Sequence, residues 1–127
     1  MEDEMHFRLS VLGQIAVTVQ DLDRAIRFYR DQLGIPFLFQ TSNLAFFDCQ
    51  GVRLMLGLPE EVAEVQPVNS VLYFKVKDIE RAYATLSGRD VVFTHAPHLI
   101  AKLPDHDLWM AFFTDPDGNP LAVMSEV

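Results

Sequence analysis

The sequence predicts an α+β fold of two tandem βαβββ modules, whose curved mixed sheets form a half-barrel cleft. Three observations predict it. A β-branched segment leads into an amphipathic helix pattern, the pattern returns further along the chain, and short strand-like segments separated by turns follow each helix. The chain of 127 residues fits one domain with a single core, so we expect residues 1–127 to form one domain.

The first module begins with a strand over residues 14–19 that runs into a helix. This segment is rich in β-branched side chains, and Asp21 follows it with a carboxylate that can cap a helix N-terminus. Apolar residues then recur at three- and four-residue steps, and Gly34 is typical of a helix end. The stripe consists of Leu22, Ala25, Ile26, Tyr29 and Leu33.

Three short strands complete module 1, which covers about residues 10–58. We expect them at about 36–40, 43–48 and 52–58, with turns at Thr41-Ser42 and Gln50-Gly51. Residues 59–68 contain two prolines and three glutamates without a clear period, so they are interpreted as the linker between the modules.

Module 2, about residues 69–126, repeats the pattern of module 1. A shift of 57 positions (71 minus 14) places residues 71–83 over residues 14–26 with coincident apolar positions, which indicates an internal duplication. The identical pairs are Val19/Val76, Asp21/Asp78, Arg24/Arg81 and Ala25/Ala82.

The rest of module 2 contains a second helix and further strands. The helix carries Ile79, Ala82, Tyr83 and Leu86 on one side and is followed by Gly88. Strand candidates lie at 91–95, 98–102, 108–114 and 120–125, with a turn at residues 115–119.

Composition excludes several classes of partner. The formal net charge of −8 opposes attraction to nucleic acid and to anionic membranes. The apolar runs are too short to cross a bilayer, and the acidic start differs from a signal peptide, so we expect a cytoplasmic protein. The single Cys49 cannot form an internal disulfide and is interpreted as a structural thiol.

Two segments resemble the vicinal oxygen chelate superfamily, which includes glyoxalases, bleomycin resistance proteins and extradiol dioxygenases. Residues 14–34 resemble its opening strand and helix, and residues 113–121 resemble its closing turn. With the internal repeat, the resemblance covers about residues 10–126. Members differ widely in activity, so the resemblance leaves the function open. It does imply a homodimer.

The resemblance also implies four metal-ligand positions, which the enzymes of the superfamily fill with His, Glu or Gln. They fall on Gln14, Met55, Val71 and Ala122. Gln14 has an amide oxygen and Met55 a thioether suited to soft metals, whereas Val71 and Ala122 have no donor atom. We therefore judge these positions non-functional for metal and expect no cofactor, with a divalent metal as the disfavoured alternative.

The segment of residues 95–110 contains three of the four histidines and the only tryptophan. Asp105 and Asp107 can hold the imidazole of His106 in one tautomer, which makes His106 a weak candidate for a catalytic acid or base. A polar turn is the alternative. His95 and His98 are three residues apart and should face opposite sides of a strand, so a three-histidine metal site with His106 is disfavoured.

Side chains that alternate toward the cleft are candidates for ligand binding. They combine aromatic rings, two cations and hydrogen-bonding groups, although core packing or a solvated face explains several of them as well. The candidates are Gln14, Phe46, Arg53, Tyr73, Lys75, His98 and Trp109.

The favoured function is a metal-independent protein that binds a small molecule, a drug or a metabolite, as the bleomycin resistance branch does. The alternative is a metal-dependent lyase, isomerase or dioxygenase of the lactoylglutathione lyase type with an atypical ligand set. A metal-free enzyme that uses His106, and an interaction domain without a ligand, are weaker possibilities. Whether the cleft lies within one chain or across a dimer stays open.

Overall fold

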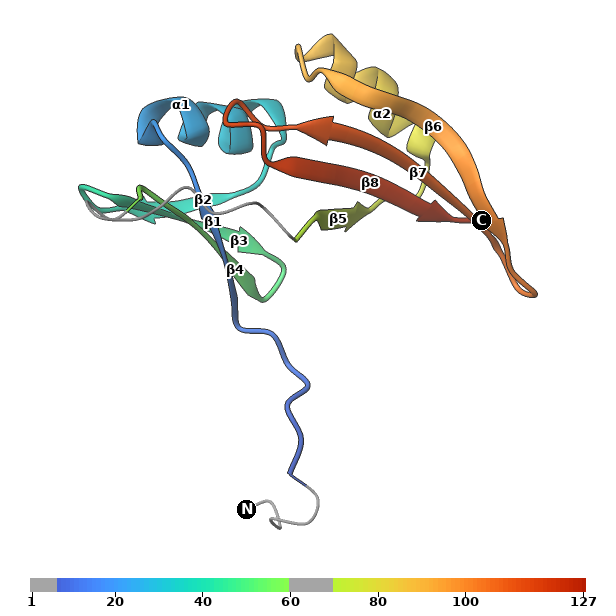
Figure 1. Ribbon diagram of the computed structural model, residues 1–127, viewed down its shortest axis with the longest axis horizontal. Helices are drawn as coiled ribbons and strands as arrows, with labels where there is room; N and C mark the ends of the chain where they lie inside the picture. The colour runs from blue at the N-terminus through green and yellow to red at the C-terminus, as the bar shows by residue number, and fades with distance from the viewer. Residues whose placement is uncertain (1–6, 60–69) are drawn as a thin grey trace.

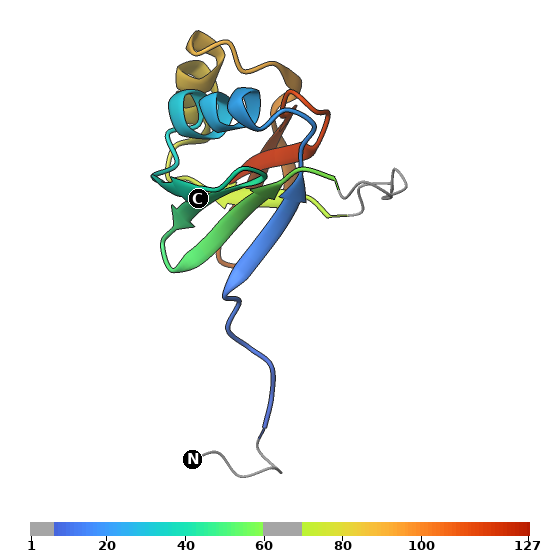
Figure 2. The same ribbon diagram turned by 90° about the vertical axis from the view of Figure 1, so that its left-hand side faces the viewer.

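Two four-stranded sheets of identical topology form the body of the protein (Figure 1). The structure, a computed structural model, describes residues 7–59 and 70–127. Each sheet mixes one parallel with two antiparallel strand pairs, and the helices of both modules lie on the same side of the sheets (Figures 1 and 2). The α+β class and the two modules are confirmed. No strand pairing joins the two sheets within the described residues, so the half-barrel is open.

Module 1 has the predicted order of elements. Its sheet has the order β1-β4-β3-β2, with the first strand parallel to the last. Asp21 caps the helix as predicted, because its carboxylate accepts a hydrogen bond from the N–H of Arg24 at 3.0 Å. The elements are β1 (Gln14–Thr18), α1 (Leu22–Ile26), η2 (Arg27–Gln32), β2 (Phe37–Gln40), β3 (Leu44–Cys49) and β4 (Val52–Gly57).

The second half of the first helix is a π-helix, which the sequence does not predict. In η2 the N–H of Leu33 donates to the carbonyl of Phe28, five residues back, at 3.0 Å. This wider turn buries both Phe28 and Tyr29, whereas the 3.6-residue pattern places only Tyr29 on the apolar stripe. Gly34 ends the helix in the left-handed region, with a φ of 77°.

Module 2 repeats this arrangement with the sheet order β5-β8-β7-β6. Asp78, which matches Asp21 in the repeat, caps the second helix by accepting from the N–H of Arg81 at 3.1 Å. The elements are β5 (Leu72–Lys75), α2 (Ile79–Gly88), β6 (Phe93–Lys102), β7 (Asp107–Thr114) and β8 (Pro120–Glu126). The predicted linker, 59–68, lies outside the described residues except for Pro59.

The two strands expected at 91–95 and 98–102 are one strand, so this prediction was wrong. β6 continues through Pro97, and its pairing with β7 shifts register three times. Between His95 and His98 three steps on β6 oppose only two steps on β7, from Phe112 to Met110. Such a bulge absorbs an extra residue without ending the strand.

The hydrophobic core fills the space between the helices and the sheets. Tyr29 is fully buried, as are Phe47 of β3 and Leu54 of β4, and Phe113 of β7 is 1% exposed. The core is continuous across both modules, because α1, η2 and residues of β7 and β8 belong to one cluster. No helix of residues 7–59 or 70–127 covers the opposite face of either sheet.

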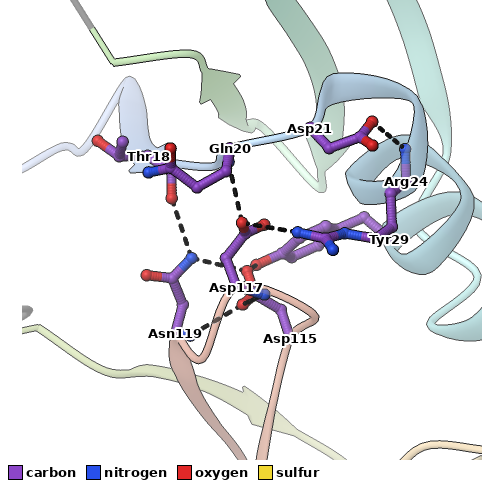
Figure 3. Close-up of polar contacts among 8 residues, drawn as sticks. All are labelled: Thr18, Gln20, Asp21, Arg24, Tyr29, Asp115, Asp117 and Asn119. Carbon is purple, nitrogen blue, oxygen red and sulfur yellow. Dashed lines mark hydrogen bonds and ion pairs between the residues drawn. The ribbon is translucent and has the colours of Figure 1, made fainter.

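A buried carboxylate joins the two modules on the helix side (Figure 3). Asp115, at the end of β7, accepts a hydrogen bond from the hydroxyl of Tyr29 at 2.8 Å and from the side-chain amide of Asn119 at 2.7 Å. The backbone N–H groups of Asp117 and Asn119 donate to its other oxygen at 2.9 and 2.8 Å. All four contacts compensate the cost of burying this carboxylate.

The same turn makes further bonds to module 1. Asn119 donates to the carbonyl of Thr18 at 3.0 Å. Asp117 accepts from the N–H of Gln20 at 2.9 Å and from the guanidinium of Arg24 at 3.0 Å. The residues 115–119 therefore hold β1 and the first helix against the end of β7.

Candidate functional site

The face of each sheet that points away from the helices is the candidate site, and we call it the open face. Because side chains alternate along a strand, Gln14 of β1 and Arg53 and Met55 of β4 share the open face of module 1. Phe46 of β3 lies opposite Met55 and faces the same way. Three of the predicted ligand-binding residues, Gln14, Phe46 and Arg53, are thus neighbours.

Contacts on the open face of module 1 build a mixed aromatic and polar surface. The rings of Phe39 and Phe46 are stacked with centroids 4.6 Å apart. The Cζ atom of Arg53 lies 5.8 Å from the centroid of the Phe46 ring, which is within the range of a cation–π interaction. The amide nitrogen of Gln14 is 3.8 Å from the sulfur of Met55.

On the open face of module 2, three rings gather around Phe112. Its ring centroid lies 6.2 Å from Tyr73, 5.7 Å from His95 and 6.2 Å from His98. The expectation that His95 and His98 face opposite sides was therefore wrong. The bulge between them adds the residue that returns His98 to the side of His95.

The two histidines have different hydrogen-bond partners. Nδ1 of His98 lies 2.8 Å from the carbonyl oxygen of Ala96. Because a carbonyl only accepts, this nitrogen donates, and Nε2 is left as the acceptor of the neutral ring. Nδ1 of His95 lies 3.2 Å from the hydroxyl of Thr94.

A chain of charged groups borders this face. Lys75 pairs with Glu126 at 3.1 Å, and the other oxygen of Glu126 lies 3.0 Å from Nε2 of His106. Nδ1 of His106 is 2.8 Å from Asp105. The carboxylate of Asp105 thus orients the imidazole of His106. The second carboxylate beside the ring belongs to Glu126 of β8 and not to Asp107, whose backbone forms hydrogen bonds with that of Val127.

Trp109 is the exception among the predicted ligand-binding residues. It lies on the helix side of β7, packs against the core and lines a cavity near the start of α2. The strand alternates faces, so Trp109 is opposite in direction to its neighbours Leu108 and Met110. Trp109 therefore does not lie on the same side of the sheets as Gln14.

The four positions implied for a metal do not fit a hard or borderline cation. Gln14 and Met55 lie together on module 1, and Ala122 lies opposite Tyr73 on module 2. They offer one amide oxygen and one thioether, and hydrocarbon at Val71 and Ala122, whereas such a cation needs several charged or imidazole ligands. Within the described ranges, no group of three or more His, Cys, Asp or Glu residues is placed to hold an ion.

Cys49 lies half-buried at the end of β3. Burial, and then the charge of Asp48, raises the pKa of its thiol. A raised pKa lowers the thiolate fraction at neutral pH, which is unfavourable for a nucleophile.

The sheet topology and the open faces are those of a known family. Residues 11–123 match the Glyoxalase/Bleomycin resistance protein/Dioxygenase superfamily. The chain belongs to this superfamily. The Agrobacterium tumefaciens lactoylglutathione lyase is a structural neighbour, with a TM-score of 0.73 and 23% identity over 92% of this chain and 94% of that one.

Relatives within the superfamily carry different names. The chain is 28% identical to the uncharacterized protein YraH of Bacillus subtilis, over 88% of this chain and 95% of that protein. It is 24% identical to the metallothiol transferase FosB of Lysinibacillus sphaericus, over 85% of this chain and 77% of that protein. The catechol-2,3-dioxygenase of Bacillus subtilis is 23% identical over 91% of this chain, which spans only 41% of that enzyme.

Sequence reasoning missed the centre of the module 2 face and the junction between modules. Phe112 is not among the candidates predicted from the sequence, but the strand register places it on the open face. Tyr29 and Asp115 are 86 positions apart, and their hydrogen bond has no local signal.

Proposed function

We propose that this protein binds a small molecule without a metal, against the open faces of its two sheets. The observation that carries the proposal is the donor set at the four positions, where one amide oxygen and one thioether replace the ligands of a metal centre. A Lewis acid held there would lack the negative charge that retains it. Binding of a small molecule requires only apolar surface and hydrogen-bonding groups, which these residues can supply.

The composition of the open faces favours a flat, unsaturated ligand. Phe39 and Phe46 on one module, and Tyr73 and Phe112 on the other, offer ring surfaces for stacking. Gln14, Arg53 and His98 add hydrogen-bonding groups beside them. Such a mixture of apolar surface and few polar groups is typical of small-molecule sites.

We propose further that the protein acts as a cytoplasmic homodimer in which a second copy covers the open faces. Tyr73 is 47% exposed, and the rings around it have no covering element among the described residues. The segment of residues 7–13 leads away from the sheets and exposes Phe7, Leu9 and Val11 by 65%, 91% and 91% (Figure 2). Exposed apolar surface of this kind is typical of protein interfaces. None of the helices in the described part of the chain is long and apolar enough to span a membrane.

A metal-loading experiment tests the central claim. Purified protein, dialysed against Ni²⁺, Zn²⁺ or Mn²⁺ and then desalted, should retain far less than one ion per chain by elemental analysis. The variant Met55→Glu/Val71→His/Ala122→Glu should retain close to one, because it adds an imidazole and two carboxylates to the amide of Gln14 at the four positions. Stoichiometric metal in the unmodified protein would refute the proposal. Failure of the triple variant would show that the four side chains do not converge.

One observation favours the alternative, a metal-dependent lyase, isomerase or dioxygenase with an atypical ligand set. His95 and His98 lie on one face, with ring centroids 6.2 Å apart, and the bond of His98 to Ala96 uses Nδ1 and not Nε2. A metal held by this pair would depend on both imidazoles. Any ion retained by the unmodified protein should then be lost in His98→Ala and kept in His106→Ala, whose ring bonds to Glu126 instead.

A further inference from the structure

A groove lies on the helix side of the sheets, separate from the open faces. It has a volume of about 450 Å³, which is within the usual range for small-molecule sites. Its walls come from both modules: Ile35 follows the first helix, Phe74 and Val76 lie on or after β5, and Leu86 belongs to α2. Strand alternation separates it from the open face, because Phe74 points to the helices and Tyr73 points away.

The inner part of this groove is apolar. Phe113 and Val123 of the central strands form its floor and are 1% and 3% exposed. Ala82 and Leu86 of α2 form one side, and Leu33 and Ile35 of module 1 form the other. An aliphatic or aromatic group of a ligand would lose contact with water there, which is the main source of affinity for such groups.

The rim of the groove is positively charged, although the protein as a whole is acidic. The chain has a net charge of −8, but three cations, Lys77, Arg81 and Arg89, line this groove with a single carboxylate, Asp78. Asp78 is engaged in capping α2 through the N–H of Arg81. No ion pair among the described residues includes Lys77 or Arg81.

Arg89 is held at the junction of the two modules. Its guanidinium donates to the carbonyl of Gln32 at 3.2 Å, and the side chain of Gln32 donates to the carbonyl of Arg89 at 2.9 Å. These reciprocal bonds fix a cation at the mouth of the groove and leave further N–H groups of the guanidinium to donate.

We infer that this groove binds an amphipathic anion, with its apolar body on the floor formed by Phe113 and Val123 and its carboxylate, sulfonate or phosphate between Arg81, Arg89 and Lys77. Arginine favours such oxyanions because its planar fork donates two parallel hydrogen bonds. The inference does not depend on the function proposed for the open faces, which lie on the other side of the sheets.

Calorimetric titration with three probes that carry similar straight hydrocarbon chains tests the inference. Octanoate should bind saturably. Octan-1-ol and octyltrimethylammonium should bind on the order of tenfold more weakly, because they keep the apolar chain and lose the charge-assisted hydrogen bonds. Equal affinity for octanoate and octan-1-ol, or no saturable binding of octanoate, would overturn it.

Charge-reversal variants locate the site. Arg81→Glu should weaken octanoate binding on the order of tenfold or more, and Thr85→Trp, an exposed α2 position that lines the groove, should block it by filling the space. Arg27→Glu makes the same charge change on the exposed side of η2 and should leave the affinity unchanged. Arg81→Gln replaces Arg81→Glu if the latter does not unfold cooperatively.

Two results would contradict the assignment to this groove. One is an equal loss of affinity in Arg27→Glu and Arg81→Glu, which would indicate a response to net charge alone. The other is loss of octanoate binding in Arg53→Glu with retention in Arg81→Glu, which would place the anion on the open face of module 1. Neither result bears on metal retention, so the proposed function is tested independently.

Discussion

At the scale of single residues, Asp115 is the polar centre of the molecule. It is buried, and both of its oxygens are occupied by donors from two modules. A buried acceptor that loses one donor bears the cost of incomplete hydrogen bonding. The junction between the modules is therefore sensitive to small changes at Tyr29 or Asn119.

The substitution Tyr29→Phe should lower the free energy of unfolding by about 1–3 kcal/mol, because it removes the hydroxyl that donates to Asp115. Urea denaturation measures the change. Tyr83→Phe on α2 is the matched control, since no hydrogen bond of the Tyr83 hydroxyl to described residues is present, and it should change stability far less. Equal effects of the two substitutions would contradict the role of Asp115.

The stability of the protein should also fall at high pH through Tyr29. Burial, and then the charge of Asp115, raises the pKa of Tyr29 well above its ordinary value near 10. Above about pH 10 the phenol ionises in the unfolded chain but stays protonated in the folded one, so the folded state binds more protons and the free energy of unfolding decreases with pH. The Tyr29→Phe variant should show a flatter decrease above pH 10 in denaturation experiments. Parallel curves for the two proteins would count against this cause.

At the scale of elements, the end of α2 differs from the sequence signal. The sequence predicts Gly88 as the residue that ends the helix. The residue that adopts the left-handed backbone conformation after α2 is instead Asp90, with a φ of 66°. The N–H of Val91 donates to Leu86 at 3.0 Å and that of Asp90 to Ser87 at 3.1 Å, the pattern of a Schellman cap. Gly88 is thus an ordinary residue of the last helical turn.

Two substitutions at this helix end should therefore stabilise the protein. Gly88→Ala adds a Cβ where no atom lies within 4 Å, and Asp90→Gly relieves a left-handed backbone, each with a gain of about 0.5–1 kcal/mol. Gly118→Ala, at a φ of 83°, is the contrasting control and should destabilise. Thermal denaturation of the three variants measures these effects. A loss of stability in Gly88→Ala would show that Gly88 is needed for the stop.

At the scale of the whole molecule, no helix in the described part of one chain covers its two open faces, and residues 7–13 are exposed. Figure 1 shows both helices on one side of the sheets and residues 7–13 leading away from the body. Phe7, Leu9 and Val11 occupy alternate positions of this segment, and all three side chains are exposed. In the proposed homodimer these residues lie against the second copy.

Replacing Phe7, Leu9 and Val11 together with serine should shift the protein from dimer to monomer, because the contact would lose three large exposed apolar side chains. Light scattering coupled to size-exclusion chromatography over a dilution series measures the shift. Val92→Ser, an exposed apolar position of module 2, should leave the dimer intact. A monomeric unmodified protein at all concentrations would refute the homodimer.

Periodicity, repeats and strand alternation within short segments were enough to predict the two modules, the helix caps at Asp21 and Asp78 and the neighbourhood of Gln14, Phe46 and Arg53. Four features depend on the folded chain: the shared face of His95 and His98, the direction of Trp109, the bond between Tyr29 and Asp115, and the cationic groove. A bulge changes the face of every later residue, and contacts between distant segments depend on how the modules pack. Neither leaves a periodic signal in the chain.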